Sequence, residues 1–238
     1  MKEFYKKYIG IIRLVLCFII FYFSAYLITI PLDILKIDYR TDDTIYYIVL
    51  FGVNLLRAIL ILSLHFNDLK KEFKSFKKNF WEYSDIAVKY WLIGIAVMAI
   101  SNILISMLTP VKMAANETEV RSMINAAPIF SLVLTTITAP ISEELIFRKS
   151  FRDVLQDKYK YIITSGLVFG AMHILSTDVS LYNLLYIIPY SSLGIAFACI
   201  CYKTKNTFPS MLVHAIHNGA ITIVTIVSLL NGIIIWKE

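Results

Sequence analysis

Two adjacent carboxylates interrupt an apolar stretch of this sequence. Residues 140–148 read Pro-Ile-Ser-Glu-Glu-Leu-Ile-Phe-Arg, which places Glu143, Glu144 and Arg148 among residues suited to lipid. A charged side chain at membrane depth costs about 3 kcal/mol on insertion scales and therefore marks a candidate functional site. The chemistry that such carboxylates could perform is general acid–base catalysis or proton relay.

The two glutamates are expected to have different roles. Adjacent residues of an α-helix point about 100° apart, so Glu143 and Glu144 cannot face the same partner. Glu144 precedes Arg148 by four residues, the favourable orientation for an ion pair along one helix face. Glu144 is therefore predicted to be an ionised, structural residue, and Glu143 to be the general base or acid. Pro140 lacks a backbone donor and is expected to open the helix locally.

Histidines supply further groups for the same chemistry. Phe169 precedes His173 by four residues, so the phenyl ring can pack on the imidazole. His214 and Asn218 also lie four residues apart, and His217 overlaps part of their face and is an alternative to His214. A single buried histidine usually serves only in helix packing. A glutamate, two histidines and an amide on three separate helices instead favour a functional site.

The composition indicates which elements must position these residues. The chain is 58% hydrophobic and only 17% charged, which predicts an all-α, polytopic transmembrane helix bundle. About seven spanning helices are expected, and the site should lie among the last four. The expected spans are 8–30, 44–64, 88–109, 128–147, 161–175, 181–201 and 209–235, of which 161–175 is short. Lysines cluster in short segments between these runs, which argues against nucleic acid as a partner and for the lipid bilayer.

The distribution of basic residues predicts how the chain is oriented. Lys and Arg are frequent in the N-terminus, 65–87, 148–160 and 202–207 and scarce in the segments between, so the N-terminus is predicted to be cytoplasmic and the C-terminus outside. Segment 65–87 is predicted to be a basic cytoplasmic loop, although its lysines and phenylalanines also fit an interfacial helix. Residues 1–127 then form an N-terminal membrane-anchoring unit of three spans, and 128–238 a catalytic helix core.

The depths of the candidate residues disagree at first sight. At a rise of 1.5 Å per residue, Glu143 lies about 7 Å from Arg148, whereas His173 lies about 18 Å from Tyr161. The two side chains cannot meet if both helices begin at the same level. Either the fifth helix starts in the aqueous phase or is strongly tilted, or the site lies at the bottom of a water-filled cavity. Of these, a cavity open to the cytoplasm is favoured.

The ordered motifs resemble those of a known family. Glu143-Glu144-x-x-x-Arg148, Phe169-x-x-x-His173 and His214-x-x-x-Asn218, on successive hydrophobic helices, are similar to those of the type II CAAX prenyl protease and bacteriocin-processing (CPBP, Abi) family of intramembrane proteases. The resemblance implies an endopeptidase in which Glu143 activates water with the help of His173. It also implies that His214 and Asn218 stabilise the oxyanion, with Glu144 and Arg148 in support.

Several alternatives stay open. The sequence contains neither Gly-x-Ser-x-Gly nor His-Glu-x-x-His, so no cofactor is expected, but Glu143, His173 and His214 could together bind zinc. The expected substrate is a membrane-associated peptide or lipidated protein, and peptide maturation, bacteriocin processing or immunity in a bacterial cell membrane is favoured. A proton-coupled transporter and a non-catalytic membrane scaffold are the competing classes. The lack of evident inverted repeats argues against the transporter.

Overall fold

The computed structural model describes residues 2–175 and 180–232, and the regular elements in these ranges are all helical. Two of them, η1 and η2, are π-helical. In chain order the elements are α1 Lys2–Phe23, α2 Tyr26–Ile34, α3 Asp43–Lys78, α4 Phe80–Leu108, α5 Ala115–Ala126, α6 Pro128–Val133, η1 Leu134–Thr138, α7 Ala139–Glu143, η2 Glu144–Ser150, α8 Phe151–Val154, α9 Lys158–Leu175, α10 Leu181–Leu184, α11 Ile187–Thr204 and α12 Phe208–Leu230.

The bundle is that of an integral membrane protein. Among the described residues, six helical segments are long and apolar enough to cross a bilayer, namely Tyr8–Ile34, Asp43–Lys78, Phe80–Leu108, Pro128–Val154, Leu181–Thr204 and Phe208–Leu230. The all-α polytopic bundle is thus confirmed, and six of the about seven expected spans meet these criteria of length and composition. The difference is α9, whose first turn contains Lys158 and Lys160. Its apolar remainder spans about 22 Å, less than a hydrocarbon core of about 30 Å.

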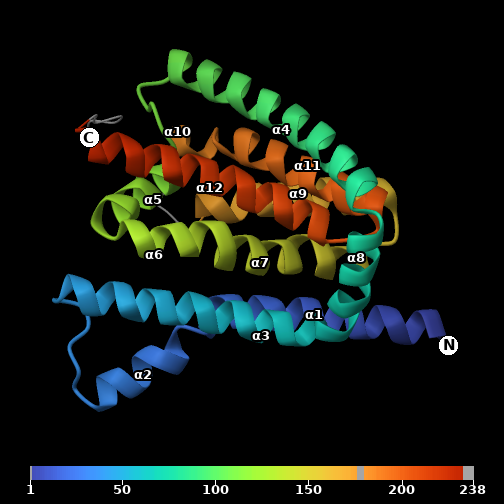
Figure 1. Ribbon diagram of the computed structural model, residues 1–238, viewed down its shortest axis with the longest axis horizontal. Helices are drawn as coiled ribbons and strands as arrows, with labels where there is room; N and C mark the ends of the chain where they lie inside the picture. The colour runs from blue at the N-terminus through green and yellow to red at the C-terminus, as the bar shows by residue number, and fades with distance from the viewer. Residues whose placement is uncertain (1, 176–179, 233–238) are drawn as a thin grey trace.

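The connections gather at two ends of the bundle (Figure 1). The N-terminus, the α3–α4 junction, and the α8–α9 and α11–α12 connections lie at one end, which we call the basic end. The α4–α5 connection, α5 and the C-terminal end of α12 lie at the other. This grouping agrees with the alternation of lysine-rich and lysine-poor segments. Which end faces the cytoplasm stays a prediction. The C-terminal residues 233–238, predicted to be outside, do not belong to the described residues.

The predicted cytoplasmic loop at 65–87 is wrong. Helix α3 continues to Lys78 and α4 begins at Phe80, so Asn79 alone separates two long helices. The aromatic residues of this segment do not mark a separate interfacial helix, because the rings of Phe73 and Phe76 pack on Phe208 with centroids 5.2 and 5.8 Å apart. This contact with the start of α12 explains why the helix persists through a lysine-rich sequence.

The N-terminal helices pack closely against the later ones. Cys17 of α1 and Ile61 of α3 share one buried cluster with Leu145 and Phe147 of η2. Helix α4 contributes Ala87 to a second cluster, which it shares with residues of α11 and α12. The division into an anchoring unit, 1–127, and a catalytic core, 128–238, stays a prediction, but the two parts have a continuous apolar interface.

Glycines allow α9 and α11 to approach closely. A Cβ atom added at Gly166 would lie 2.8 Å from the backbone nitrogen of Ile195, and one at Gly170 would lie 2.8 Å from that of Ser191. On the opposing helix, a Cβ at Gly194 would lie 2.7 Å from the carbonyl oxygen of Gly166. Small residues at such crossings bring helix backbones together in membranes. This contact fixes the position of α9, and with it the position of His173.

We expect the Gly166→Ala substitution to lower the free energy of unfolding by about 2 kcal/mol, because the added methyl group meets backbone that cannot rotate away. Thermal unfolding in detergent measures this effect. Gly52→Ala in α3 is the matched control, since its Cβ would meet only the side chain of Ile28 at 3.6 Å. That variant should be unchanged or more stable by up to about 1 kcal/mol. Equal melting temperatures for the two variants would contradict the close α9–α11 contact.

Candidate active site

Glu143 and Glu144 lie where two kinds of helix meet. Segment Pro128–Val154 forms one span, in which the short α7 is flanked by the π-helical segments η1 and η2. Pro140 has no N–H group, and its ring would clash with the carbonyl of an ordinary preceding turn. The wider turn of η1, after which the Ala139 N–H donates to the Leu134 carbonyl, accommodates the proline. The expected local opening at Pro140 thus takes the form of a π-helical turn, a feature frequent at functional sites.

Glu144 and Arg148 form the predicted ion pair. Nη2 of Arg148 lies 3.4 Å from Oε1 of Glu144, and both side chains are fully buried. The same Oε1 lies 3.0 Å from Nδ1 of His214, a contact that the sequence did not predict. The guanidinium group lies over the ring of Phe169 at 4.4 Å and donates to the Ser165 hydroxyl at 3.4 Å. Glu144 therefore links η2 to α12.

Glu143 faces two histidines that come from different helices. Its Oε2 lies 3.9 Å from Nε2 of His173 on α9 and 3.7 Å from Nε2 of His214 on α12. These separations are too long for direct hydrogen bonds. They are short enough for one water molecule to contact all three atoms. The structure therefore brings together the glutamate and both histidines that the sequence selected.

The depth disagreement came from misplacing Arg148. The sequence analysis put this residue in a cytoplasmic segment, but it is buried, and the helix continues to Val154. Glu143 is therefore about 16 Å from the end of its helix, and His173 about 22 Å from the start of α9. The offset falls from about 11 Å to about 6 Å. Ion pairs with buried or partly buried carboxylates keep the basic residues of η2 and α8 inside the bundle. Lys149, for example, pairs with Asp153.

Aromatic rings hold the two imidazoles in place. Phe169 packs on His173 as predicted, with centroids 4.4 Å apart, and Tyr190 stacks on His173 at 4.7 Å. Nδ1 of His173 lies 2.9 Å from the Phe169 carbonyl oxygen, so it carries the hydrogen and leaves Nε2 directed at Glu143. Phe197 stacks on His214 at 4.8 Å. Sequence reasoning missed Tyr190 and Phe197, because an aromatic residue within an apolar run gives no sign of its partner.

Asn218 and His217 are adjacent in the chain but make different contacts in the structure. Nδ2 of Asn218 donates to the Thr135 carbonyl at 3.1 Å, which leaves its second amide hydrogen available to a ligand. Asn218 lines the same cavity as Glu143. His217 also lines this cavity, but its ring packs against Trp91, with centroids 6.3 Å apart. The geometry therefore favours His214, and not His217, as the histidine that acts with Glu143.

A cavity of about 170 Å³ leads from this cluster toward α5. Asn116 and Glu117 of α5 line it, and Asn116 donates to the Tyr190 hydroxyl at 3.2 Å. Burial raises the pKa of Glu117, an effect that the Arg121 guanidinium partly offsets. A neighbouring cavity of about 300 Å³ shares Glu117 and Tyr190 with the first. Because α5 lies opposite the basic end (Figure 1), the cavity leads away from the end that the sequence predicts to be cytoplasmic. The opening toward the cytoplasm therefore stays a prediction.

The separations within the cluster bear on zinc binding. In a tetrahedral site with bonds of about 2.0 Å, ligand atoms lie about 3.3 Å apart. The separations of Glu143 from the two histidines exceed this value, and no trio of His, Cys, Asp or Glu side chains in the described ranges forms a metal-binding group. The cluster is therefore wider than a regular tetrahedral zinc site by about 0.5 Å, and metal-free chemistry stays a prediction. Both Nδ1 atoms are nonetheless held by oxygen acceptors, as in zinc-ligating histidines.

The fourth histidine of the chain, His65, escaped the sequence analysis. His65 was assigned to a loop, but it is fully buried in α3, and its Nε2 lies 3.1 Å from the Ser150 hydroxyl. Its position at the end of an apolar run was the signal that could have identified it. His65 ties α3 to η2 and does not line the cavity at Glu143.

The fold and the cluster define a class, that of polytopic membrane proteins with a buried glutamate–histidine centre. Comparison with known proteins finds a family resemblance for part of the chain. Residues 125–220 match the family model described as Type II CAAX prenyl endopeptidase Rce1-like. This segment includes all three motifs, so the predicted resemblance is confirmed for it.

Two curated relatives match a similar length of chain. The Bacillus subtilis (strain 168) protein named "Putative membrane peptidase YdiL" is 26% identical over 111 residues, 45% of this chain and 42% of the relative. An uncharacterized protein of Mycoplasma capricolum subsp. capricolum is 32% identical over 102 residues, 42% of this chain and 29% of the relative. The matched segments thus span less than half of either relative. No solved structure matches the chain.

Proposed function

We propose that this protein is an intramembrane endopeptidase that hydrolyses a peptide bond with water activated by Glu143. The observation that carries the proposal is the approach of Glu143 to His173 and His214, at 3.9 and 3.7 Å, beside a cavity. Peptide hydrolysis needs a base for water, an acid for the leaving amine and donors for the oxyanion. The residues around this cavity supply all three.

Glu143 is the proposed base. A water molecule placed between the two Nε2 atoms and Oε2 of Glu143 gives one proton to the carboxylate, and its oxygen attacks the carbonyl carbon of the scissile bond. Nε2 of His173 accepts the second hydrogen bond of this water and orients it. The proton then passes from Glu143 to the amide nitrogen as the carbon–nitrogen bond breaks. The products are a free carboxyl group and a free amine.

His214 and Asn218 are the proposed oxyanion donors. Nδ1 of His214 faces the Glu144 carboxylate and therefore carries a hydrogen. Its Nε2 lies on the other side of the ring, 3.7 Å from Glu143, and is the proposed first donor to the oxyanion. The available amide hydrogen of Asn218 supplies the second donor.

The proposed substrate is a membrane-associated peptide or lipidated protein. A bacterial cell membrane, with the N-terminus of the chain cytoplasmic, is the proposed setting, and peptide maturation or bacteriocin processing the proposed role. A peptidomic comparison of cells that make the wild-type protein with cells that make the Glu143→Gln variant tests this. A peptide that appears as two fragments only in cells with the wild-type protein identifies the cleaved bond. Identical peptidomes in the two cell types argue against a protease.

Cleavage by the purified protein is expected to survive dialysis against a strong chelator, because the proposed base is a carboxylate that acts directly on water. The measurement is the rate of reporter cleavage before and after dialysis, together with elemental analysis of the protein. A loss of activity that zinc restores would instead establish the zinc-dependent form, with Glu143, His173 and His214 as the ligands.

A further inference from the structure

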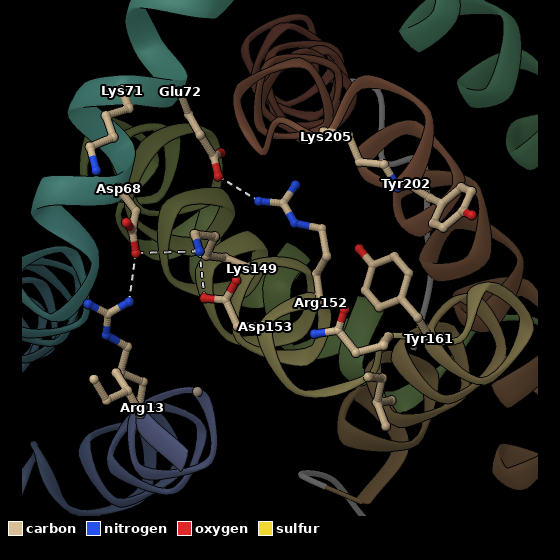
Figure 2. Close-up of a pocket in the computed structure, with 14 residues that line it drawn as sticks. Arg13, Asp68, Lys71, Glu72, Lys149, Arg152, Asp153, Tyr161, Tyr202 and Lys205 are labelled. Atoms are coloured by element: carbon tan, nitrogen blue, oxygen red, sulfur yellow. Dashed lines mark hydrogen bonds and ion pairs between the residues drawn. The ribbon is translucent and has the colours of Figure 1, made fainter. Parts of the chain in front are cut away.

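A second and larger cavity lies at the basic end of the bundle. Its volume is about 670 Å³, and α1, α3, α8, α9 and α11 contribute to its wall. Five cationic and three anionic side chains line it, namely Arg13, Lys71, Lys149, Arg152, Lys205, Asp68, Glu72 and Asp153. Figure 2 shows these groups around a common space. The cavity is therefore cationic, and the residues that line it are not those around Glu143.

The three carboxylates of this cavity are already engaged. Asp68 pairs with Arg13 at 2.6 Å, and Asp153 pairs with Lys149 at 2.5 Å. Glu72 pairs with Arg152 at 2.5 Å. Its other oxygen accepts from the Thr207 backbone nitrogen at 2.7 Å. These contacts leave the carboxylates with little capacity to bind a cation, so a cationic ligand does not fit here.

The other side of the cavity carries a donor without an acceptor and a lysine, Lys205, whose recorded partner is the ring of Tyr202, with Nζ 3.7 Å from the ring centroid. The Tyr161 hydroxyl is buried without a hydrogen-bond partner among the described residues, and the residue is 1% exposed. It points toward the space between Arg152 and Lys205 (Figure 2). Neither Lys71 nor Lys205 forms an ion pair in the part of the chain that the structure describes. Partial desolvation and repulsion by Arg152 lower the pKa of the largely exposed Lys205, as expected for a cation without an anionic partner.

We propose that this cavity binds a phosphate group, carried by an anionic lipid headgroup or present as free phosphate. Tyr161, Arg152 and Lys205 would donate to its oxygens, and an anion between the two cations would relieve their repulsion. Phosphate oxygens suit such a convergent set of charged donors. Basic pockets between membrane helices commonly accept anionic headgroups. Beside the cavity, α1 exposes Ile12 and Leu16, an apolar surface for acyl chains. The proposal does not depend on the protease function.

The test is binding to the full-length protein in detergent, measured by native mass spectrometry with phosphatidylglycerol or phosphatidylcholine. We expect phosphatidylglycerol to bind at least about fivefold more tightly, and Lys205→Gln to reduce its affinity about fivefold. Tyr161→Phe, which removes one oxygen atom, should weaken binding as well. Lys203→Gln is the matched control, because Lys203 is exposed nearby on α11, outside the cavity, and loses the same charge. It should leave the affinity unchanged.

Competition by inorganic phosphate separates the two sources of the ligand. Displacement of the lipid by millimolar phosphate supports a site for the phosphate group alone, and retention of the lipid supports a headgroup site with acyl contacts. Equal binding of the two lipids would overturn the proposal. Equal losses in Lys205→Gln and Lys203→Gln would also overturn it, because they would show general attraction to a basic surface. Lys205 is exposed, so its variant should fold even if Tyr161→Phe does not.

Discussion

The Glu143→Gln variant is expected to lose cleavage of a reporter peptide by about 10³-fold while keeping its melting temperature. Removing a general base typically costs 10²- to 10⁴-fold in rate. Glutamine has the same shape but cannot accept the proton of water, so the cavity and both histidines should stay in place. Glu143 contributes no short ion pair, since its distances to the histidines are 3.7 and 3.9 Å. Single-turnover cleavage in detergent, with thermal unfolding in parallel, measures both properties.

Glu119→Gln is the matched control, because Glu119 lies exposed on α5 and loses the same charge. It should cleave at the wild-type rate. Full activity of Glu143→Gln would remove Glu143 from the role of base. Proton-coupled flux in liposomes that Glu143→Gln abolishes, without any cleavage by the wild type, would favour a transporter. If the Glu143→Gln variant still protected cells in an immunity assay, a non-catalytic membrane scaffold would be favoured.

The Glu144→Gln variant is expected to lower the free energy of unfolding by about 3–5 kcal/mol, the usual cost of removing one partner of a buried ion pair. Arg148 would keep a charge in a fully buried position without its carboxylate. His214 would also face a neutral amide in place of the carboxylate, so cleavage should fall too. Denaturant unfolding in mixed micelles measures the loss of stability.

A second pair provides the comparison. Glu117 and Arg121 have the same four-residue spacing at 2.7 Å but are partly exposed, so Glu117→Gln should cost about 1 kcal/mol or less. The double variant Glu144→Gln with Arg148→Met should recover part of the stability that the single variant loses, because it removes the stranded charge. Equal losses of unfolding free energy in Glu144→Gln and Glu117→Gln would contradict the conclusion that the Glu144–Arg148 pair is buried away from solvent.

Helix periodicity was sufficient to predict the local contacts of the site. The i,i+4 spacing predicted the Glu144–Arg148 pair and the packing of Phe169 on His173, since both depend only on the geometry of one helix. The ordered motifs predicted the family that residues 125–220 match. What failed was the placement of charges. A basic residue beside an apolar run suggests a loop. Arg148 is instead paired with the buried carboxylate of Glu144, and Lys149 is paired with Asp153.

Contacts between helices could not be predicted from the sequence. The stacking of Tyr190 on His173 and the hydrogen bond from His214 to Glu144 depend on how α9, α11 and α12 cross. Neither residue spacing nor hydropathy encodes that crossing without the fold. The π-helical form of η1, which accommodates Pro140, was likewise not predicted, because the proline alone indicated only a local opening of the helix.

The shortness of α9 has a consequence for the biogenesis of the protein. A segment of 18 residues that begins with Lys158 and Lys160 partitions into lipid less readily than its neighbours. Its glycines, Gly166 and Gly170, leave its backbone open until α11 covers them. The position of α9 in the bundle therefore depends on its contact with α11. A nascent chain that ends before α11 would lack this contact, and with it the support that places His173 beside Glu143.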